Sequence, residues 1–489
     1  MSDLIEKLID EIGPGHMGST AYDTAWTARL GEIDWSLSSR ALSWLAAHQL
    51  PDGSWGAPAP MYYHDRVICT LAAMIALAYR GRRGQDKLQI EMGKLALERI
   101  VSGATQGLQA DPNGATVGFE MIAPTLAAEA EKLGIIKRQG DRILGRLSKQ
   151  RAKKLSFLKD NMISRRVTIA FSAEMAGTDG KHMLDIANLQ EDNGSVGLSP
   201  SATAYFATYI KRGDEPALNY LRTIAKSDGG MPNVAPFDVF EISWTLWNLS
   251  LIPSLSKNAK LKPYIDFLSN AWQPRRGVGF AAEYSVKDSD DTGLVFDTLL
   301  RFNCEKDLAS VLLYEEKDYF RCFDLEANPS ISANIHVLGA LGQAGLDRRN
   351  SSVHKVLNFL NKVRGQSPFW VDKWHSSPYY ATAHAIIACA GFAQELVAES
   401  VQWIIESQNK NGSWGTYLST AEETAYALQA LWVWNEKVTK VPKSVFKNGG
   451  RWLKEHLDEP YPPLWIGKCL YNPNLVIRSA IISALALTE

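Results

Sequence analysis

The chain has 489 residues, of which 46% are hydrophobic, and it contains 15 Trp, 17 Tyr and 16 Phe. It is long enough for two domains or one large helical barrel, and too rich in apolar side chains to be disordered. The 52 Lys and Arg residues against 53 Asp and Glu residues give a net charge of -1, which excludes a global field that would attract nucleic acid or an anionic membrane.

The first predicted element is an acidic amphipathic helix over residues 1–11, which lacks the basic start and apolar core of a signal peptide. Apolar stretches farther along, such as 71–78 and 480–487, are much shorter than a membrane span. The five cysteines form no Cys-x-x-Cys pair and no metal-ligand spacing, which favours a reducing compartment. The sequence therefore predicts a cytoplasmic protein without stable membrane insertion.

Most of the periodic segments repeat their apolar residues at helical spacing. Examples are Val67–Tyr79, Ala333–Leu341, Tyr380–Cys389 and Thr424–Trp434. Short stretches with Gly, Pro and Asn separate these segments, as expected for turns between helices. The predicted fold class is all-α, built from helical hairpins.

One turn sequence recurs along the chain. Gln-Leu-Pro-Asp-Gly-Ser-Trp-Gly at 49–56 returns as Gln-Asn-Lys-Asn-Gly-Ser-Trp-Gly at 408–415, and in weaker form at 190–197. Its Gly permits the positive φ that closes a helix, its Asp or Asn caps the turn, and its Trp can lie across a neighbouring helix end while the Gln bonds exposed backbone groups. Such a turn staples adjacent helices, and two full copies near opposite ends indicate two related helical barrels.

Residues 137–166 form the most one-signed stretch, with eleven Lys or Arg against Asp141 and Asp160. A charge run of this kind is typical of a solvated helix or an inter-domain connection. The alternative is a basic wall that meets an anionic group of a substrate. A nucleic-acid surface is disfavoured because aromatic residues are not interleaved with the charges.

Three carboxyl groups lie within four residues in Asp288-Ser289-Asp290-Asp291, just before the apolar helix predicted over 294–300. They cannot all ionise cheaply at such close quarters. If Asp290 is buried among apolar and aromatic groups, desolvation and its ionised neighbours let it keep its proton near neutrality. A neighbouring carboxylate that accepts a hydrogen bond would then orient the remaining proton toward a bound alkene.

The alternative for these aspartates is a helix N-cap with acidic residues in the first turn, where the helix dipole favours negative charge. A calcium loop is a weaker alternative, because the remaining ligands of an EF-hand are absent downstream.

Further segments occur in order along nearly the whole chain. They are Ser-Thr-Ala-Tyr-Asp-Thr-Ala-Trp at 19–26, Val-Gly-Phe-Glu at 117–120, Ser-Pro-Ser-Ala-Thr-Ala at 199–204, Gly-Gly-Met-Pro-Asn-Val at 229–234 and Trp-Ile-Gly-Lys-Cys-Leu-Tyr at 465–471. Together with the aspartate motif, they resemble the bacterial class II diterpene cyclases. The resemblance implies two α/α-barrel domains with the active cavity between them: a β domain from 1–30 and 235–489, which carries the acid, and a γ domain from 31–234.

The resemblance also implies an activity, that of an isomerase. The expected reaction is protonation-initiated cyclisation of geranylgeranyl diphosphate to a bicyclic diphosphate of the labdane, halimane or clerodane type, with the diphosphate retained. The ionisation-dependent class I enzymes carry a D-D-x-x-D segment, which this sequence lacks. Alternatives are a cyclase acting on farnesyl diphosphate, a squalene-hopene-type triterpene cyclase, a protein prenyltransferase subunit, which would need a zinc site, and a non-enzymatic helical scaffold.

By this resemblance, Asp290 is the general acid, and Asp288 and Asp291 hold and tune it. Asn334, in the segment Asn-Ile-His-Val-Leu at 334–338, resembles the family residue that supports the acid. Taken alone, Asn334 would be read as a satisfied core contact.

Aromatic faces can stabilise a migrating carbocation without capturing it, and cations can hold the retained diphosphate. The aromatic candidates are Trp374, Tyr379, Tyr380 and Trp414, and the cationic candidates are Lys373, Lys468, Lys153 and Lys154. For each aromatic residue the alternative is an ordinary core position, and for each lysine an ordinary surface position.

Magnesium is expected from the family, but its ligands are unknown. Some relatives carry an acidic motif just before Val-Gly-Phe-Glu, whereas residues 108–116 here contain only Asp111. Plant enzymes that make ent-copalyl diphosphate carry a His where this chain resembles them at Leu155, which argues against that product and leaves the terminating base open. A class I terpene synthase acting downstream and a homodimer are expected partners.

Overall fold

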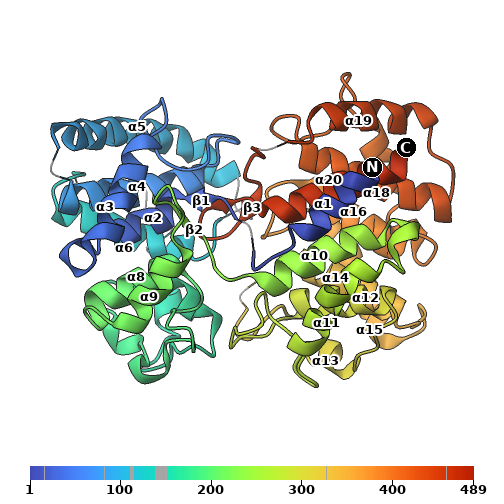
Figure 1. The fold of residues 1–489 in the computed structure, drawn as a ribbon, viewed down its shortest axis with the longest axis horizontal. Helices are drawn as coiled ribbons and strands as arrows, with labels where there is room; N and C mark the ends of the chain where they lie inside the picture. The colour runs from blue at the N-terminus through green and yellow to red at the C-terminus, as the bar shows by residue number, and fades with distance from the viewer. Residues whose placement is uncertain are drawn as a thin grey trace.

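The computed structural model describes the chain except residues 16, 82, 111–114, 138–146, 148–150, 327 and 459, and the side chains of 101–110. Two helical lobes lie side by side (Figure 1). Along the described parts of the chain, every helix is too short or too polar to cross a membrane. The predicted all-α class is confirmed, since the strands are two short antiparallel pairs among the described residues.

Six helices form a closed inner ring in the right-hand lobe of Figure 1, each packed against the next and the last against the first. They are α10 (Asp238–Ser250), α12 (Ser289–Arg301), α14 (Ile331–Gln343), α16 (Pro378–Cys389), α18 (Ala421–Lys437) and α20 (Asn474–Thr488). These helices are buried on most faces, as expected for the core layer of a barrel.

An outer layer of helices packs against this ring and buries one apolar stripe each. It consists of α11 (Lys262–Ala271), α13 (Ala309–Leu312), α15 (Ser351–Arg364), α17 (Ala398–Glu406), α19 (Lys443–Glu455) and α1 (Ser2–Asp10). Helix α1 comes from the other end of the chain and packs against α20. It buries Ile5, Leu8 and Ile9, which share one helical face because they are three and four residues apart.

Five elements form the inner ring of the left-hand lobe: α2 (Ala21–Ala28), α4 (Tyr63–Arg80), α6 (Phe119–Lys132), the 3-10 segment η2 (Thr168–Ala176) and α8 (Pro200–Tyr205). Outside them lie α3 (Trp35–Ala47), α5 (Gly84–Ala110) and α9 (Glu215–Ile224). The chain continues beyond α8 as one π-helical turn, η5 (Phe206–Ile210).

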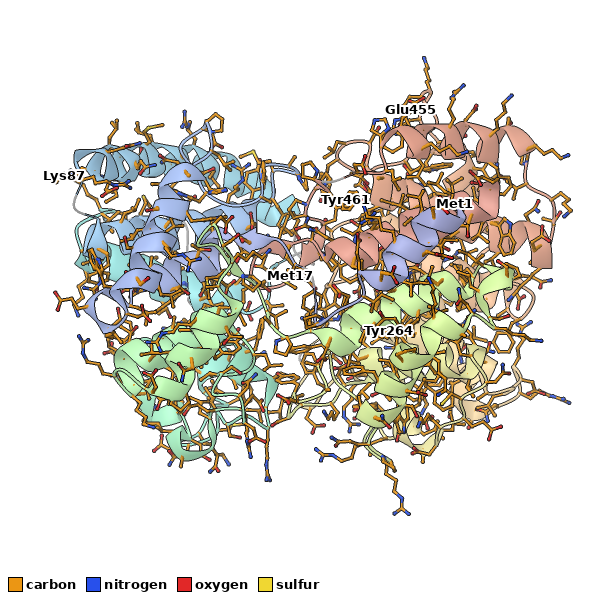
Figure 2. The ribbon with its side chains drawn as sticks, viewed as in Figure 1. Met1, Met17, Lys87, Tyr264, Glu455 and Tyr461 are labelled. Atoms are coloured by element: carbon orange, nitrogen blue, oxygen red, sulfur yellow. The ribbon has the colours of Figure 1, made fainter. Side chains whose placement is uncertain are left out.

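The lobes are joined by two small sheets. Strand β1 (Ser19–Thr20) pairs with β2 (Met231–Pro232), and the hairpin of β3 (Trp465–Ile466) and β4 (Leu470–Tyr471) extends from the right-hand lobe toward the left. Leu470 N donates to Asp65 Oδ1 at 2.8 Å, which ties the hairpin to α4. Met17 lies between the lobes, while Met1 lies well inside the right-hand lobe (Figure 2).

The predicted boundary of the β domain at residue 30 is wrong. The core of the right-hand lobe includes Ile5 to Ile12, whereas the buried residues from Ala21 to Leu30 belong to the core of the left-hand lobe. The physical reason is that α2 is buried along its whole length and serves as an inner helix of the left ring. The N-terminal contribution to the right-hand lobe is therefore α1 and the few residues after it.

The two full copies of the recurrent turn staple helices as predicted, one copy in each lobe. Gln49 Nε2 donates to Gly53 O at 2.8 Å and to Gln89 O at 2.9 Å, and Gln408 Nε2 donates to Gly412 O and to Val445 O, both at 3.0 Å. The Trp of each copy donates its Nε1 hydrogen to the backbone ten residues upstream, at 2.8 Å in the left lobe and 2.7 Å in the right. Each turn thus ties together two outer helices.

Candidate active site

Asp288 caps the first turn of α12 in the right-hand lobe. Its Oδ1 accepts a hydrogen bond from Asp291 N at 2.8 Å, and its own backbone N donates to Val278 O at 3.0 Å. The N-cap alternative is therefore correct for Asp288, which also fixes the start of the helix so that the following carboxyl groups project from its first turn.

The carboxyl groups of Asp288 and Asp291 are both removed from water. Burial raises the pKa of Asp288 to about 7. Burial, and then repulsion by Asp288, raises the pKa of Asp291 well above its usual range. The pair therefore holds a proton near neutral pH, which limits the negative charge at the start of α12.

Asp290 differs from both neighbours because 15% of its side chain stays accessible. Its Oδ1 lies 2.5 Å from Nδ1 of His336 on α14, a ring that is only 2% exposed. His336 Nε2 in turn lies 2.9 Å from Nδ1 of His384 on α16. Three neighbouring inner helices thus bring one carboxyl group and two imidazoles into a single hydrogen-bonded row, with the carboxyl group at its accessible end. These helices, α12, α14 and α16, lie in the right-hand lobe of Figure 1.

Aromatic rings pack closely around this row. Trp244 stands edge-on to His336 with ring centres 5.5 Å apart, and its Nε1 donates to the Tyr380 hydroxyl at 3.0 Å. Phe240 stacks on Trp244 at 4.0 Å, and Trp465 packs edge-on against Tyr380 at 4.8 Å. Burial, and then the charge of Asp290, raises the pKa of the Tyr380 hydroxyl, so this ring stays neutral beside the acid.

A buried glutamate on α18 holds part of this aromatic wall in place. Glu422 Oε1 accepts hydrogen bonds from Trp465 Nε1 at 2.7 Å and from the Tyr426 hydroxyl at 3.0 Å. His375 Nδ1 accepts from Ser377 N at 3.1 Å, so its hydrogen lies on Nε2, which donates to the same carboxylate at 3.2 Å. The positions of Trp465 and His375 are therefore set by one carboxylate.

Asn334 does not contact the acid, which corrects the prediction made for it. Its side-chain amide donates to Phe320 O at 2.9 Å and to Ser330 O at 2.8 Å, and its Oδ1 accepts from Phe320 N at 2.9 Å. These bonds tie the segment before α14 to the helix. The hydrogen-bond partner of Asp290 is instead His336, two residues farther along.

Of the four predicted aromatic candidates, the structure brings Tyr380 to the acid. Tyr379 points to the outer layer and stacks on Trp403 of α17 at 4.7 Å. Trp414 is fully buried in the recurrent turn, and Trp374 donates to Ser330 Oγ at 3.1 Å near the start of α14. The predictions for Tyr379 and Trp414 are wrong because consecutive helix residues face different sides and because the Trp of the turn fills a core position.

The predicted lysines do not form one cluster. Lys373 pairs with Glu326 and donates to Asn328 O at 2.8 Å. Lys153 is exposed. Lys154 pairs with Glu120 of the Val-Gly-Phe-Glu segment, and this pair belongs to the left-hand lobe, whereas the acid lies in the right-hand lobe.

Lys468 is fully buried between the lobes, contrary to the role predicted for it. Its Nζ donates to Glu174 Oε1 at 2.6 Å, to Ser199 Oγ at 2.7 Å and to Ser201 Oγ at 2.6 Å. An ammonium group has three hydrogens, and all three are used here. Lys468 therefore fastens the β3–β4 hairpin to the left-hand lobe and has no donor left for a diphosphate.

The described residues do not fit a magnesium site of their own. Within the described part of the chain, three metal-ligating side chains come together at Asp65, Cys69 and Cys469, all of them buried. Two thiols suit soft metals, whereas Mg²⁺ prefers an octahedral set of oxygen ligands. Asp111 lies outside the described residues, and Glu120 is paired with Lys154.

Comparison with known proteins places this arrangement in a family. The family model of the squalene-hopene cyclase C-terminal domain matches residues 321–454. The Type B diterpene cyclase of Mycobacterium tuberculosis (strain ATCC 25618 / H37Rv) is 46% identical over 481 residues, covering 97% of this chain and 96% of that protein. The chain belongs to the bacterial class II diterpene cyclases.

Further relatives agree with this assignment over the full length of the cyclase. The ent-copalyl diphosphate synthase of Streptomyces sp. (strain KO-3988) is 28% identical and covers 99% of this chain and 95% of that protein. The solved structure of ent-copalyl diphosphate synthase from Streptomyces platensis superposes with a TM-score of 0.80 at 28% identity, covering 100% of this chain and 98% of that one. The chain is a class II diterpene cyclase and thus an enzyme, so the non-enzymatic scaffold is excluded.

Sequence reasoning missed four side chains that the structure places around the acid of this cyclase: His336, His384, Trp244 and Trp465. Two of them carried a usable signal. His384 lies four residues after Tyr380, which places both on one helical face, and His336 lies within the quoted segment 334–338. Trp244 and Trp465 come from α10 and from the hairpin, and their approach to α14 and α16 depends on closure of the ring.

Proposed function

We propose that this cyclase acts on geranylgeranyl diphosphate and releases a bicyclic diterpenyl diphosphate of the labdane, halimane or clerodane type, with the diphosphate retained. The observation that carries the proposal is the position of Asp290: a partly accessible carboxyl group at the start of an inner helix, bonded to His336, whose ring packs against Trp244 and Tyr380. The diterpene and copalyl diphosphate activities named for the relatives support the same substrate class.

The proposed chemistry starts at the terminal double bond of the prenyl chain. The O–H bond of Asp290 breaks and its electrons stay on the carboxylate, while the π electrons of the alkene form the new C–H bond. The cation left on the more substituted carbon is attacked by the next double bonds in turn, which closes two rings. A proton is finally lost to a base, so the product is an isomer of the substrate.

The surroundings of Asp290 suit each part of this sequence. Asp288 and Asp291 share a proton, so together they carry less negative charge than two carboxylates would. Less negative charge beside Asp290 makes it easier for Asp290 to give up its proton. The rings of Trp244, Phe240, Tyr380 and Trp465 present π electrons rather than free nucleophiles. A ring face stabilises a nearby cation by about 0.5–2 kcal/mol, so several rings together contribute several kcal/mol.

Magnesium remains a proposal for this cyclase. We expect the cation to arrive with the phosphate oxygens of the substrate, because Mg²⁺ prefers oxygen ligands and is often bound through substrate phosphates. The retained diphosphate would make the product a substrate for a class I terpene synthase downstream, and a homodimer is likewise proposed.

The test is incubation of the purified cyclase with geranylgeranyl diphosphate or farnesyl diphosphate, with Mg²⁺ or with EDTA, followed by dephosphorylation and mass spectrometry of the alcohols. We expect a cyclic C20 alcohol from wild type and none from Asp290→Asn, because an amide is far too weak an acid. Cyclic product from farnesyl diphosphate alone would move the proposal to a sesquiterpene substrate. Linear alcohol in every reaction would overturn it.

A further inference from the structure

His336 lies between two groups that compete to set the position of its hydrogen. Its Nδ1 is 2.5 Å from Asp290 Oδ1, and its Nε2 is 2.9 Å from His384 Nδ1. Both contacts are short enough to be hydrogen bonds, and each bond needs one hydrogen between its two heavy atoms. When both rings are neutral, the tautomer of His384 therefore determines which partner donates at Asp290.

His384 is held as a neutral ring by its surroundings. It is 2% exposed, stacks on Trp247 of α10 at 4.5 Å, and packs against Tyr380 at 4.6 Å and Tyr426 of α18 at 5.9 Å. Burial, and then the nearby His336 and His375, lowers the pKa of His384 well below its usual range. Beyond Trp247 lies the Asp297–Arg301 ion pair, to which Trp247 Nε1 donates at 2.8 Å.

A neutral imidazole carries one N–H, so two arrangements of the row are available when His336 is neutral as well. With its hydrogen on Nδ1, His384 donates to His336 Nε2, and His336 then donates from Nδ1 to Asp290 Oδ1. With its hydrogen on Nε2, His384 can only accept from His336, and Asp290 must then point its own proton at His336. The second arrangement directs the acid proton into the protein and away from a substrate.

We infer that His384 is a positioning residue, whose Nδ1 hydrogen sets His336 to donate to Asp290 Oδ1 and leaves Oδ2 of Asp290 to carry the proton to the alkene. The role of the delivered proton rests on the proposed function, whereas the direction of the two hydrogen bonds does not. Asp290 is the accessible end of the row, as delivery of its proton to a substrate requires.

The direct test is nitrogen NMR of cyclase labelled with ¹⁵N only in histidine, which reports which ring nitrogen carries the hydrogen. The His384 and His336 signals are assigned from the spectra of His384→Phe and His336→Phe. We expect His384 protonated at Nδ1 and unprotonated at Nε2. A His384 hydrogen on Nε2 would overturn the inference, whether or not the protein cyclises any substrate.

The functional test compares two replacements of the same ring. His384→Phe keeps the stacking on Trp247 but has no donor, whereas His384→Asn places an amide N–H near the former Nδ1. We expect His384→Phe to lower kcat about 10- to 100-fold with KM within about twofold, and His384→Asn to recover most of the loss. The pH profile of kcat should shift in His384→Phe and return in His384→Asn.

Tyr379→Phe is the matched control, because Tyr379 lies on the same helix but faces the outer layer. It should keep the wild-type kcat and pH profile. An unchanged kcat and pH profile in His384→Phe would overturn the inference while leaving the proposed function intact. Absence of cyclic product from the wild type would instead remove the proposed function, which the NMR result does not require.

Discussion

Each lobe buries carboxyl groups, and Glu174 in the left-hand lobe is in the opposite situation to Asp288 and Asp291 in the right-hand lobe. Glu174 meets the ammonium group of Lys468 at 2.6 Å. In the right-hand lobe, the carboxyl groups of Asp288 and Asp291 interact with each other, and burial raises the pKa of both. Burial with a matched cation produces a fastener between lobes, whereas burial without one produces groups that hold protons.

The largest expected effect comes from changing Asp290, the most accessible of the three clustered aspartates. Asp290→Asn should lower kcat by about 10³- to 10⁴-fold, because the amide keeps the shape of the side chain without its acidity. The measurement is the rate of cyclic alcohol formation after dephosphorylation. Asp266→Asn, an exposed acid on α11 that pairs with Lys262, is the control and should be as active as wild type. A residual rate above a tenth of wild type would show that another group is the acid.

The second effect comes from removing the ion pair between Lys468 and Glu174, which fastens the two lobes together. Lys468→Met leaves Glu174 buried without its cation, which should cost about 3–5 kcal/mol in the free energy of unfolding measured with urea. The double variant Lys468→Met with Glu174→Gln should recover much of that loss. If Lys468→Met abolished activity at unchanged stability, the fastening role would be wrong and substrate contact would be right.

The third effect is the pH dependence that Asp288 gives to the free energy of unfolding. Because the pKa of Asp288 is raised to about 7 in the folded protein, its neutral form is favoured there, and the associated stability is complete below about pH 4 and is lost as pH rises to about 7. The difference in unfolding free energy between wild type and Asp288→Asn should fall by up to roughly 1.4 kcal/mol per pH unit across this range. Asn also caps helices well, so the cap itself is preserved. A difference that stays constant from pH 4 to pH 7 contradicts the assignment.

The smallest effect concerns neighbouring tyrosines on one helix. Tyr380→Phe removes the acceptor of the Trp244 hydrogen bond and should lower kcat by about 5- to 10-fold, in line with about 1 kcal/mol for one buried bond. Tyr379→Phe should change kcat by less than twofold, since that ring packs on Trp403. Equal effects of the two changes would show that the hydroxyl of Tyr380 has no special place beside the acid.

Local signals predicted the helical class and the staples well. Helical spacing of apolar residues and the repeated Gln-to-Gly turn depend on neighbours in sequence, and both Gln49 and Gln408 make the bonds expected of them. The aspartate motif could also be recognised from the sequence, because Asp288 and Asp290 are two residues apart at the start of one helix.

The remaining site residues could not be placed because their roles depend on distant segments. Trp465 lies in β3 and Lys468 lies two residues beyond the end of that strand. Lys468 is nevertheless fastened to Glu174 of the other lobe, whereas Trp465 packs against Tyr380 beside the acid. Asn334 and His336 are two residues apart on α14, and only the position of α12 decides which of them reaches Asp290. The boundary at residue 30 failed for the same reason, since α2 is apolar enough for either lobe.

The placement of α1 has a consequence for how the protein is made. This helix is synthesised before the other helices of the right-hand lobe, but the surface that covers Ile5, Leu8 and Ile9 includes α20, which follows them in the chain. The left-hand lobe can assemble during translation, whereas the right-hand ring can close only after α20 has emerged. Until then, the apolar stripe of α1 is open to chaperones, so chaperone capture of nascent chains should end when α20 is released.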